Sequence, residues 1–309
     1  MRRYLISGLV VATELELPFA DPADATASDI DVVIRRGDVP PAIDTPTAAG
    51  PFWTIDGEQC LFTVPGVMRC LIANGRDITF EPASGVDDAD VTPFVMGTGF
   101  GVLLHQRGLM VLHAGSVVVG GKAVLFCGPS GAGKSTMVAA LVQRGFPFVS
   151  DDVCIVDFDA HGTPLVRPDG RLLRLWGRVV DEFSLGERRL DAVRPSIAKF
   201  FVSPEASATS SHYEIGAVYR LRAARPSELP RIARANVAEA AVSLRSSAYR
   251  PRYVAAAGEH QRLFGQVTRM AGRVSVFDLW RAVDFNALPG TVTDLLSHWH
   301  DLGLVEAAT

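Results

Sequence analysis

The chain has 309 residues, of which 48% are hydrophobic and 21% carry a charge, and its formal net charge is −4. These values are typical of a globular protein with a sizeable core, in one large or two modest domains. The slightly acidic average excludes a globally basic surface for nucleic acid or anionic membranes, although a local basic patch remains compatible with it. We therefore expect no nucleic-acid partner and no membrane partner.

The N-terminus matches the pattern of a secretory signal peptide only in part. Two arginines precede the apolar residues 4–12, but acidic residues occupy the strand-like alternation of residues 13–17, where a small-residue cleavage site would lie. We interpret this segment as a first strand. No run in the chain approaches the roughly 18 apolar residues that a membrane span requires.

Residues 1–90 have the pattern of a β-rich domain or subdomain. Runs rich in β-branched and aromatic residues alternate there with turn dipeptides. The strongest turn signal is Asn74-Gly75, which readily takes positive φ at both corners of a hairpin. The predicted strands are 30–34, 52–58, 59–64, 69–73 and 76–80, with hairpins through Asp56-Gly57 and Asn74-Gly75.

From Asp90 the pattern changes to alternating helices and strands, which predicts an α/β domain over residues 91–309. A helix should begin at Asp90, with Pro93 in its first turn, and stop at Gly108. The segment 134–144 should be an amphipathic helix, and 245–252 a loop. The other predicted elements are strands 109–119, 122–127, 146–149, 153–157, 172–176, 216–221 and 274–277, and helices 237–244, 260–270 and 291–302.

Four cysteines are scattered along the chain, with no C-x-x-C pair and no histidine at metal-ligand spacing. The pattern favours reduced thiols in apolar surroundings over a zinc site. Reduced thiols suit a cytoplasmic protein. The residues are Cys60, Cys70, Cys127 and Cys154.

A glycine-rich octet at residues 128–135 fits the pattern G-x-x-x-x-G-K-[ST]. An apolar strand precedes it and a helix follows it, as a phosphate-binding loop requires; a glycine-rich turn that binds nothing is the alternative. Such a loop points backbone N–H groups at the phosphates, Lys134 adds a mobile cation, and the Ser135 hydroxyl can ligate Mg²⁺. The predicted nucleotide contacts are Gly128, Ser130, Gly131, Ala132, Gly133, Lys134, Ser135 and Thr136.

An acidic pair, Asp151-Asp152, follows a short apolar strand that comes just after the loop helix. We expect this strand to lie beside the loop strand, so that the pair stands at the edge where α/β sheets bind ligands. One carboxylate can hold Mg²⁺ and the other can accept the proton of an attacking hydroxyl. Both can serve only if the strand ends or turns there, because adjacent strand residues point to opposite faces. An Asp-Asp turn without chemistry is the alternative.

His113 lies in the strand two steps before the loop, where a single histidine is more often structural. However, the segments around His113, the loop and Val149-Ser150-Asp151-Asp152-Val153 together resemble the catalytic core of HPr kinase/phosphorylase. They are more similar still to the HPr-kinase-like serine kinases encoded beside lasso-peptide genes, which phosphorylate the precursor peptide. The resemblance covers residues 94–157, about a fifth of the chain.

The resemblance implies an α/β fold with a P-loop core of the HPr-kinase type, which is similar to PEP carboxykinase, behind a β-rich N-terminal part. It also implies roles for single residues. Lys134 and Ser135 correspond to the P-loop lysine and the Mg²⁺ ligand, and Asp151 to the acid that accepts the proton of the substrate serine. Asp152 corresponds to the metal-associated acid, and His113 to a histidine that supports the catalytic acid.

The chain departs from this family in two places. The glycine-rich signature segment of HPr kinase/phosphorylases is not recognisable in residues 169–186, which puts HPr as substrate and phosphorolysis in doubt. The family's later catalytic arginine has no secure match, and Arg250, Arg252 and Lys199 are candidates. For each of these three, a solvated surface charge is the alternative.

The expected function is an ATP-dependent serine kinase that acts on a peptide or protein, with ATP or another nucleotide phosphate donor and Mg²⁺ as cofactors. A lasso-peptide precursor is one such acceptor, and a homo-oligomer remains open. The alternatives are a nucleotide-binding regulatory module without transfer and a small-molecule phosphotransferase similar to PEP carboxykinase. The acid pair and His113 argue against the regulatory module, because sensing needs neither a base nor its support.

Overall fold

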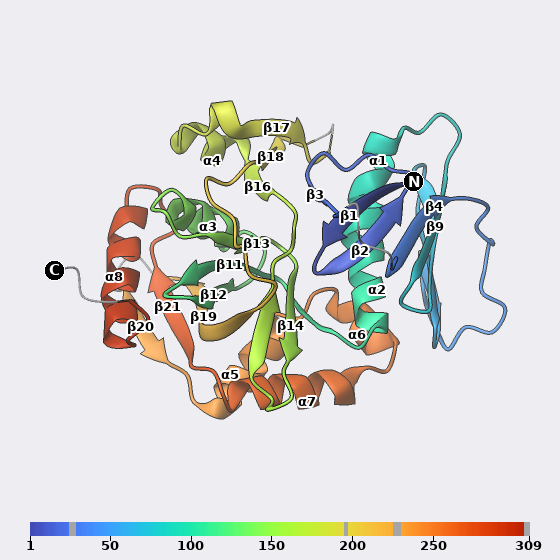
Figure 1. The fold of residues 1–309 in the computed structure, drawn as a ribbon. Helices are drawn as coiled ribbons and strands as arrows, with labels where there is room; N and C mark the ends of the chain where they lie inside the picture. The colour runs from blue at the N-terminus through green and yellow to red at the C-terminus, as the bar shows by residue number, and fades with distance from the viewer. Residues whose placement is uncertain (25–28, 195–196, 225–229, 306–309) are drawn as a thin grey trace.

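The computed structural model describes residues 1–24, 29–194, 197–224 and 230–305 (Figure 1). Within them, strands form two nine-stranded sheets and a three-stranded sheet, and helices pack on these sheets. The mixed α/β class predicted from the sequence is confirmed, and so is the β-rich character of the N-terminal part.

The first sheet consists of the N-terminal strands. The helix formed by α1 (Asp88–Phe94), the π-helical turn η1 (Val95–Gly99) and α2 (Phe100–Gln106) packs against its strands β8 and β9 (Figure 1). Its strands, in spatial order, are β3 (Asp21–Pro22), β1 (Arg2–Ile6), β2 (Leu9–Thr13), β4 (Val32–Arg36), β9 (Asp77–Pro82), β8 (Met68–Ala73), β7 (Gln59–Val64), β6 (Trp53–Asp56) and β5 (Ala48–Gly50).

The turns of this sheet agree with the sequence-based prediction at one hairpin and differ from it at another. Asn74 and Gly75 take φ of +56° and +59°, as the predicted hairpin requires. The prediction of a single first strand was wrong. Ser7 and Gly8, at φ +55° and +74°, turn the chain back, so that β1 and β2 form a hairpin. Residues 14–17 form no strand, although their side chains alternate between exposed and buried as predicted.

The second sheet carries the loop. Its central strands β12, β19 and β21 are parallel, whereas β11 is antiparallel to both β12 and β13, so β12 and β13 end at the same edge. Its strands, in spatial order, are β10 (Met110–Leu112), β14 (Cys154–Phe158), β15 (Pro164–Arg167), β19 (Tyr213–Ala223), β12 (Lys122–Cys127), β11 (Ala114–Val119) and β13 (Phe148–Ser150), with β21 (Val276–Arg281) beside β19 and β20 (Arg231–Arg234) beside β21.

The side-chain alternation of β12 explains the layers on this sheet. Val124 and Phe126 face a core that includes helices α3, α4 and α8, whereas Ala123, Leu125 and Cys127 face the core of α5 and α7. The helices are α3 (Lys134–Val142), α4 (Gly177–Glu182), α5 (Val237–Ser246), α6 (Pro251–Ala256), α7 (His260–Ala271) and α8 (Leu288–Asp301). The small third sheet holds β16 (Leu173–Trp176), β18 (Lys199–Val202) and β17 (Arg189–Ala192), with the 3-10 turn η2 (Gly186–Arg188) before β17.

The long predicted helices and the three late strands are confirmed, with most boundaries shifted by a few residues. Four predictions need correction. The strand at 109–119 breaks at His113 into β10 and β11, which pair with different strands. Helix α3 is buried around its circumference and is not amphipathic, because it lies between the sheet and other elements. Residues 245–252 include the start of α6, and β13 lies beside β11 and not beside β12.

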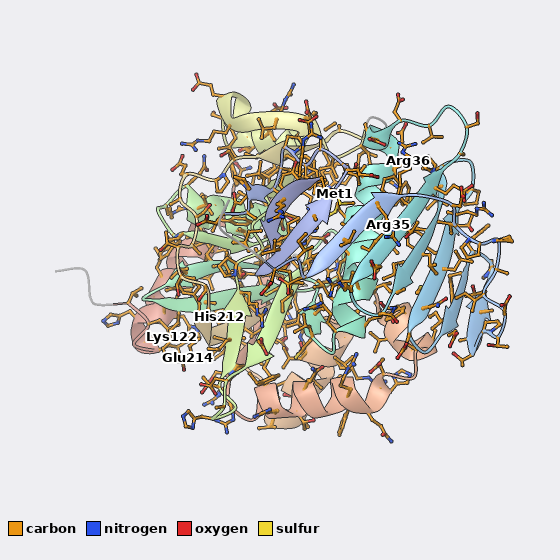
Figure 2. All side chains as sticks on the ribbon, turned by 45° about the vertical axis from the view of Figure 1, so that its right-hand side comes forward. Met1, Arg35, Arg36, Lys122, His212 and Glu214 are labelled. Atoms are coloured by element: carbon orange, nitrogen blue, oxygen red, sulfur yellow. The ribbon has the colours of Figure 1, made fainter. Side chains whose placement is uncertain are left out.

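The first residue of β12, Lys122, lies at the far end of this strand from the glycine-rich loop. There Lys122 and Glu214 point toward each other at 3.1 Å (Figure 2), and both side chains are almost half exposed. Such an exposed pair contributes little to stability. The four cysteines are buried and free, as expected. Within the described ranges, no helix combines the length and apolarity needed to cross a membrane.

Candidate functional site

The glycine-rich loop connects the end of β12 to the first turn of α3. Gly133, the residue before α3, takes a left-handed conformation at φ +84°, which favours glycine. A Cβ atom at this position would also collide with the Arg281 guanidinium. The opening N–H groups of α3 have no partners within the helix, so the loop and the helix start can receive an anion.

Lys134 lies almost fully buried in this loop, with 6% of its surface exposed. Its ammonium group donates to the carbonyl oxygens of Gly128 at 2.8 Å and Pro129 at 3.1 Å. Burial lowers the pKa of Lys134, while the nearby Asp152 counteracts this shift. The cation is therefore held by neutral carbonyls of its own loop, and an anion in the loop would neutralise it better.

Arg281, at the end of β21, supports the loop from outside. Only 3% of its surface is exposed, and its Nη2 donates to the Ala132 carbonyl at 2.6 Å while Nη1 donates to Ala282 at 3.1 Å. Its Nε has no hydrogen-bond partner, and within the described ranges Arg281 forms no ion pair with a carboxylate. Burial lowers the pKa of Arg281. Sequence reasoning missed this residue.

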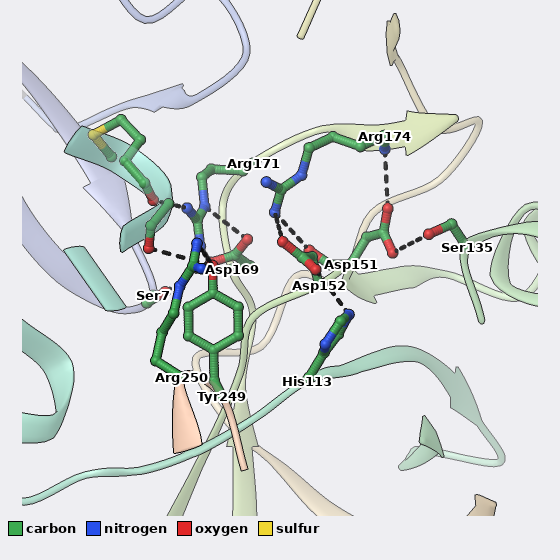
Figure 3. A network of polar contacts seen from close by, with 12 residues as sticks. Ser7, His113, Ser135, Asp151, Asp152, Asp169, Arg171, Arg174, Tyr249 and Arg250 are labelled. Carbon is green, nitrogen blue, oxygen red and sulfur yellow. Dashed lines mark hydrogen bonds and ion pairs between the residues drawn. The ribbon is translucent and has the colours of Figure 1, made fainter. Parts of the chain in front are cut away.

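The acidic pair follows β13 at the same edge of the sheet. The strand ends at Ser150, and Asp152 takes a left-handed conformation at φ +76°, which is uncommon for a non-glycine residue. This turn satisfies the condition set by the sequence, since both carboxylates project into one polar network (Figure 3). Backbone strain of this kind is found mainly at functional sites.

Asp151 faces the loop. Asp151 is only 2% exposed, and its Oδ1 accepts a hydrogen bond from the Ser135 hydroxyl at 2.8 Å. Its Oδ2 accepts from the Arg174 backbone N–H at 3.0 Å. Asp151 and Ser135 thus bring two hard oxygen ligands together at the start of α3, as a Mg²⁺ ion requires.

Asp152 faces His113. The His113 Nε2 lies 3.0 Å from Asp152 Oδ1, and the Arg174 Nη2 lies 3.2 Å from Oδ2. Burial alone would raise the pKa of Asp152. However, Arg174 and the hydrogen bond from His113 outweigh burial and hold the pKa well below its usual range. The carboxylate therefore stays ionised at neutral pH.

His113 is fixed by the break between β10 and β11. Its backbone N–H donates to the Ser247 carbonyl at 2.7 Å, so the chain leaves one strand pairing and enters another at this residue. The ring stands edge-on to Tyr249, with centroids 6.1 Å apart. The structure thus brings together the loop, the acid pair and His113.

Arg174 completes the site and was missed from the sequence. It lies in β16, and its Nη2 also donates to the Asp151 carbonyl oxygen at 3.1 Å. Of the three candidate cations, Lys199 is near enough to lower the pKa of Asp152. Arg250 contacts the Tyr249 hydroxyl at 3.3 Å, beside the site, and Arg252 lines a different cavity near Trp53.

A second buried network lies beside the acid pair (Figure 3). Arg171 donates twice to Asp169, at 2.8 Å through both Nε and Nη2, and once to the Met96 carbonyl at 3.1 Å. Ser7 donates to the same Asp169 at 2.7 Å. This network joins the N-terminal hairpin and the η1 turn to the second sheet.

Two cavities flank the site. One, of about 460 Å³, adjoins the loop and is lined by Pro129, Ser130, Arg222, Trp280 and Val283, among others. The other, of about 490 Å³, adjoins Arg174 on the side of the N-terminal sheet. No group of three or more His, Cys, Asp or Glu side chains in the described ranges could hold a metal ion. A Mg²⁺ ion at Ser135 and Asp151 would therefore need water and phosphate ligands, as is usual for Mg²⁺.

Comparison with known proteins gives limited guidance. No family model matches the chain, and no curated protein matches it. Among solved structures, the chain matches the Hpr(Ser) kinase/phosphatase from Coxiella burnetii at 16% identity and a TM-score of 0.33. That match covers 63% of this chain and 97% of the other. Likeness at this level assigns no function, and closeness to lasso-cluster kinases remains a prediction.

Proposed function

We propose that the protein is a Mg²⁺-dependent kinase that transfers the γ-phosphoryl group of ATP, or of another nucleotide donor, to a serine hydroxyl on a peptide or protein. The observation that carries the proposal is the pairing of each acid at the loop: Asp151 with Ser135 and Asp152 with His113. A regulatory nucleotide module would need the first pair at most. The second supplies an ionised acceptor for the proton of a hydroxyl.

The donor would bind through the loop. Backbone N–H groups at the start of α3 would receive the phosphates, and Lys134 would exchange its two carbonyl partners for phosphate oxygens. Arg281 would keep the Ala132 carbonyl turned away from the phosphates and add positive charge behind the loop. Binding an anion would thus neutralise two buried cations that lack carboxylate hydrogen-bond partners.

The metal would bind at Ser135 and Asp151, whose oxygen atoms already lie within hydrogen-bond distance. When bound there, Mg²⁺ would supply positive charge that offsets the negative charge developing on the phosphates during transfer. The Arg174 backbone N–H would hold the Asp151 carboxylate in place.

For the two aspartates we propose the reverse of the sequence-based assignment, because Asp151 contacts the Mg²⁺-ligating serine and Asp152 contacts the histidine. Asp152 would accept the serine proton while the serine oxygen forms its bond to the γ-phosphorus. The bond to the bridging oxygen breaks, and its electron pair leaves with the nucleoside diphosphate. Because the pKa of Asp152 is low, its main contribution would be to orient the hydroxyl and receive the proton late.

Two asparagine variants test this assignment, with synthetic peptides that each carry one serine as acceptors. Asp152→Asn should keep Mg²⁺-dependent ATP binding in calorimetry and lower transfer by about 10²–10⁴-fold. Asp151→Asn should lose the Mg²⁺-dependent part of binding. The opposite pattern would restore the sequence-based roles. Normal transfer in both variants would refute a kinase of this design, and ATP binding without any transfer by the wild type would favour a regulatory module.

A further inference from the structure

The cavity of about 490 Å³ beside Arg174 lies between residues 16–19, which connect β2 to β3, helix α1 with the η1 turn, and the small third sheet. Its volume is within the usual range for a ligand pocket, roughly 300–1,000 Å³. It is therefore large enough for a few residues of an extended chain and too small for a folded domain. The proposed function assigns nothing to it.

This cavity is connected to the acid pair through Arg174. Arg174 lines the cavity, and the same guanidinium contacts Asp152. Figure 3 shows Arg171, another lining residue, on one side of the acid pair and Ser135 on the other. A donor in the loop and an acceptor in this cavity would therefore come to the acid pair from different sides, which leaves room for a hydroxyl to attack the γ-phosphorus opposite the leaving oxygen.

The inner wall of the cavity is apolar. Phe19 stacks on Phe201 with ring centroids 4.2 Å apart, and both rings belong to the lining. Met96, Pro93 and Val193 extend this wall. An aliphatic side chain placed there would be removed from water, which favours its binding.

The mouth of the cavity is acidic. Asp88, Glu16 and Asp191 are exposed lining residues. Asp88 pairs with Arg36 and Glu16 with Arg2, but these pairs are exposed and weak. In the described ranges Asp191 forms no ion pair. The two arginines of the lining pair with Asp169 and Asp152, so the negative excess of the mouth comes from Asp191.

We infer that this cavity binds the acceptor of the proposed kinase, as an extended peptide segment with an aliphatic residue and a basic residue close to the serine. The aliphatic side chain packs against Phe19 and Phe201, and the basic side chain meets Asp88 and Asp191. The inference rests on the proposed function. The charge of the mouth argues against a second nucleotide as the occupant, because phosphates would be repelled.

The test uses three matched peptides, each with one serine and one leucine. They differ at one position close to the serine, which is Lys, Gln or Glu. The wild type should phosphorylate the Lys peptide best. The double variant Asp88→Lys and Asp191→Lys should invert this order. It should lower kcat/KM for the Lys peptide by up to about 30-fold, as expected for two partly exposed charge contacts. The KM for ATP should stay unchanged.

The double variant Asp294→Lys and Asp301→Lys is the matched control, because it makes the same charge change at two exposed positions of α8 and should leave the order intact. An unchanged order in the double variant, with active wild type, would overturn the acceptor cavity and leave the kinase standing. Equal phosphorylation of free serine and of the peptides would also overturn it. If the wild type binds ATP but phosphorylates no peptide, the proposed function itself fails.

Discussion

The two buried arginine sites of this protein differ in what neutralises the charge. Arg171, beside the N-terminal hairpin, has a carboxylate within 2.8 Å on two of its nitrogens and a carbonyl on the third. Arg281, behind the loop, has two carbonyls and an unpaired Nε. Lys134 resembles Arg281, since in the part of the chain that the structure describes its hydrogen bonds also go to carbonyls.

The difference separates a structural network from a binding site. A buried cation with a carboxylate partner is neutralised, so removing it would leave the partner carboxylate buried and unpaired. A buried cation without one is held at a cost in folding free energy, and an anionic ligand can recover that cost. By this criterion we propose that the region of Arg171 maintains the fold, whereas the region of Lys134 and Arg281 binds phosphates.

Removing Arg171, the buried cation that has a carboxylate partner, should have the largest effect on stability. Arg171→Met leaves the Asp169 carboxylate buried without its main partner, so the free energy of unfolding should fall by about 3–5 kcal/mol. Urea denaturation measures this loss. Arg171→Lys, which keeps the charge, should recover part of it. A loss below about 1 kcal/mol would show that the network is not the junction described here.

Removing a loop cation should act on function instead. Lys134→Ala should lower phosphoryl transfer by about 10²–10³-fold, because an electrostatic contact to the transferred group is lost. Its stability without nucleotide should stay close to that of the wild type, since within the described residues the ammonium donates its hydrogen bonds to neutral carbonyls. Transfer and urea denaturation on the same preparation test both statements. A stability loss as large as that of Arg171→Met would erase the distinction between the two regions.

The acid pair gives a pH-dependent test. The folded-state pKa of Asp152 is lowered, so its contribution to stability is present above the unfolded-state pKa of about 4 and is lost as pH falls through the folded value. At pH 7 the free energy of unfolding of the wild type should be about 1–3 kcal/mol larger than that of Asp152→Asn. The gap should narrow below about pH 4. A constant gap down to pH 2.5 would mean that Arg174 and His113 do not hold the carboxylate ionised.

Arg281 should show the smallest effect but the most distinctive sign. Arg281→Met should weaken ATP binding by about tenfold, while the nucleotide-free protein keeps its melting temperature or gains a little, because a poorly neutralised buried charge is removed. Arg281→Lys should restore part of the ATP affinity. Differential scanning fluorimetry with and without ATP and Mg²⁺ measures both. A lower melting temperature with unchanged ATP affinity would make Arg281 structural.

The sequence predicted those parts of the site that depend on local spacing. The loop, the acid pair and His113 lie close in sequence, and the residue types required by their chemistry are visible there. It could not predict Arg174 or Arg281, which reach the site from β16 and β21 through tertiary packing. It also could not assign the two aspartates, because the direction of each carboxylate depends on the left-handed turn at Asp152.

The errors in the fold have similar causes. The Ser7-Gly8 turn lies inside an apolar run, so one strand was predicted where a hairpin forms. The break at His113 depends on a backbone contact with Ser247, far away in sequence. Helix α3 was expected to have a solvent face, but the third sheet and α8 cover it. In the last two cases a long-range contact decided what local periodicity could not.

The most direct test of the kinase proposal is a single-turnover reaction. Wild-type protein with ATP and Mg²⁺ is mixed with the leucine- and lysine-containing serine peptide, and the products are identified by mass spectrometry. We predict phosphoserine and ADP in equal amounts, and their loss in Asp152→Asn while that variant still binds ATP. Tight binding of ATP by the wild type with neither product formed would contradict the proposal.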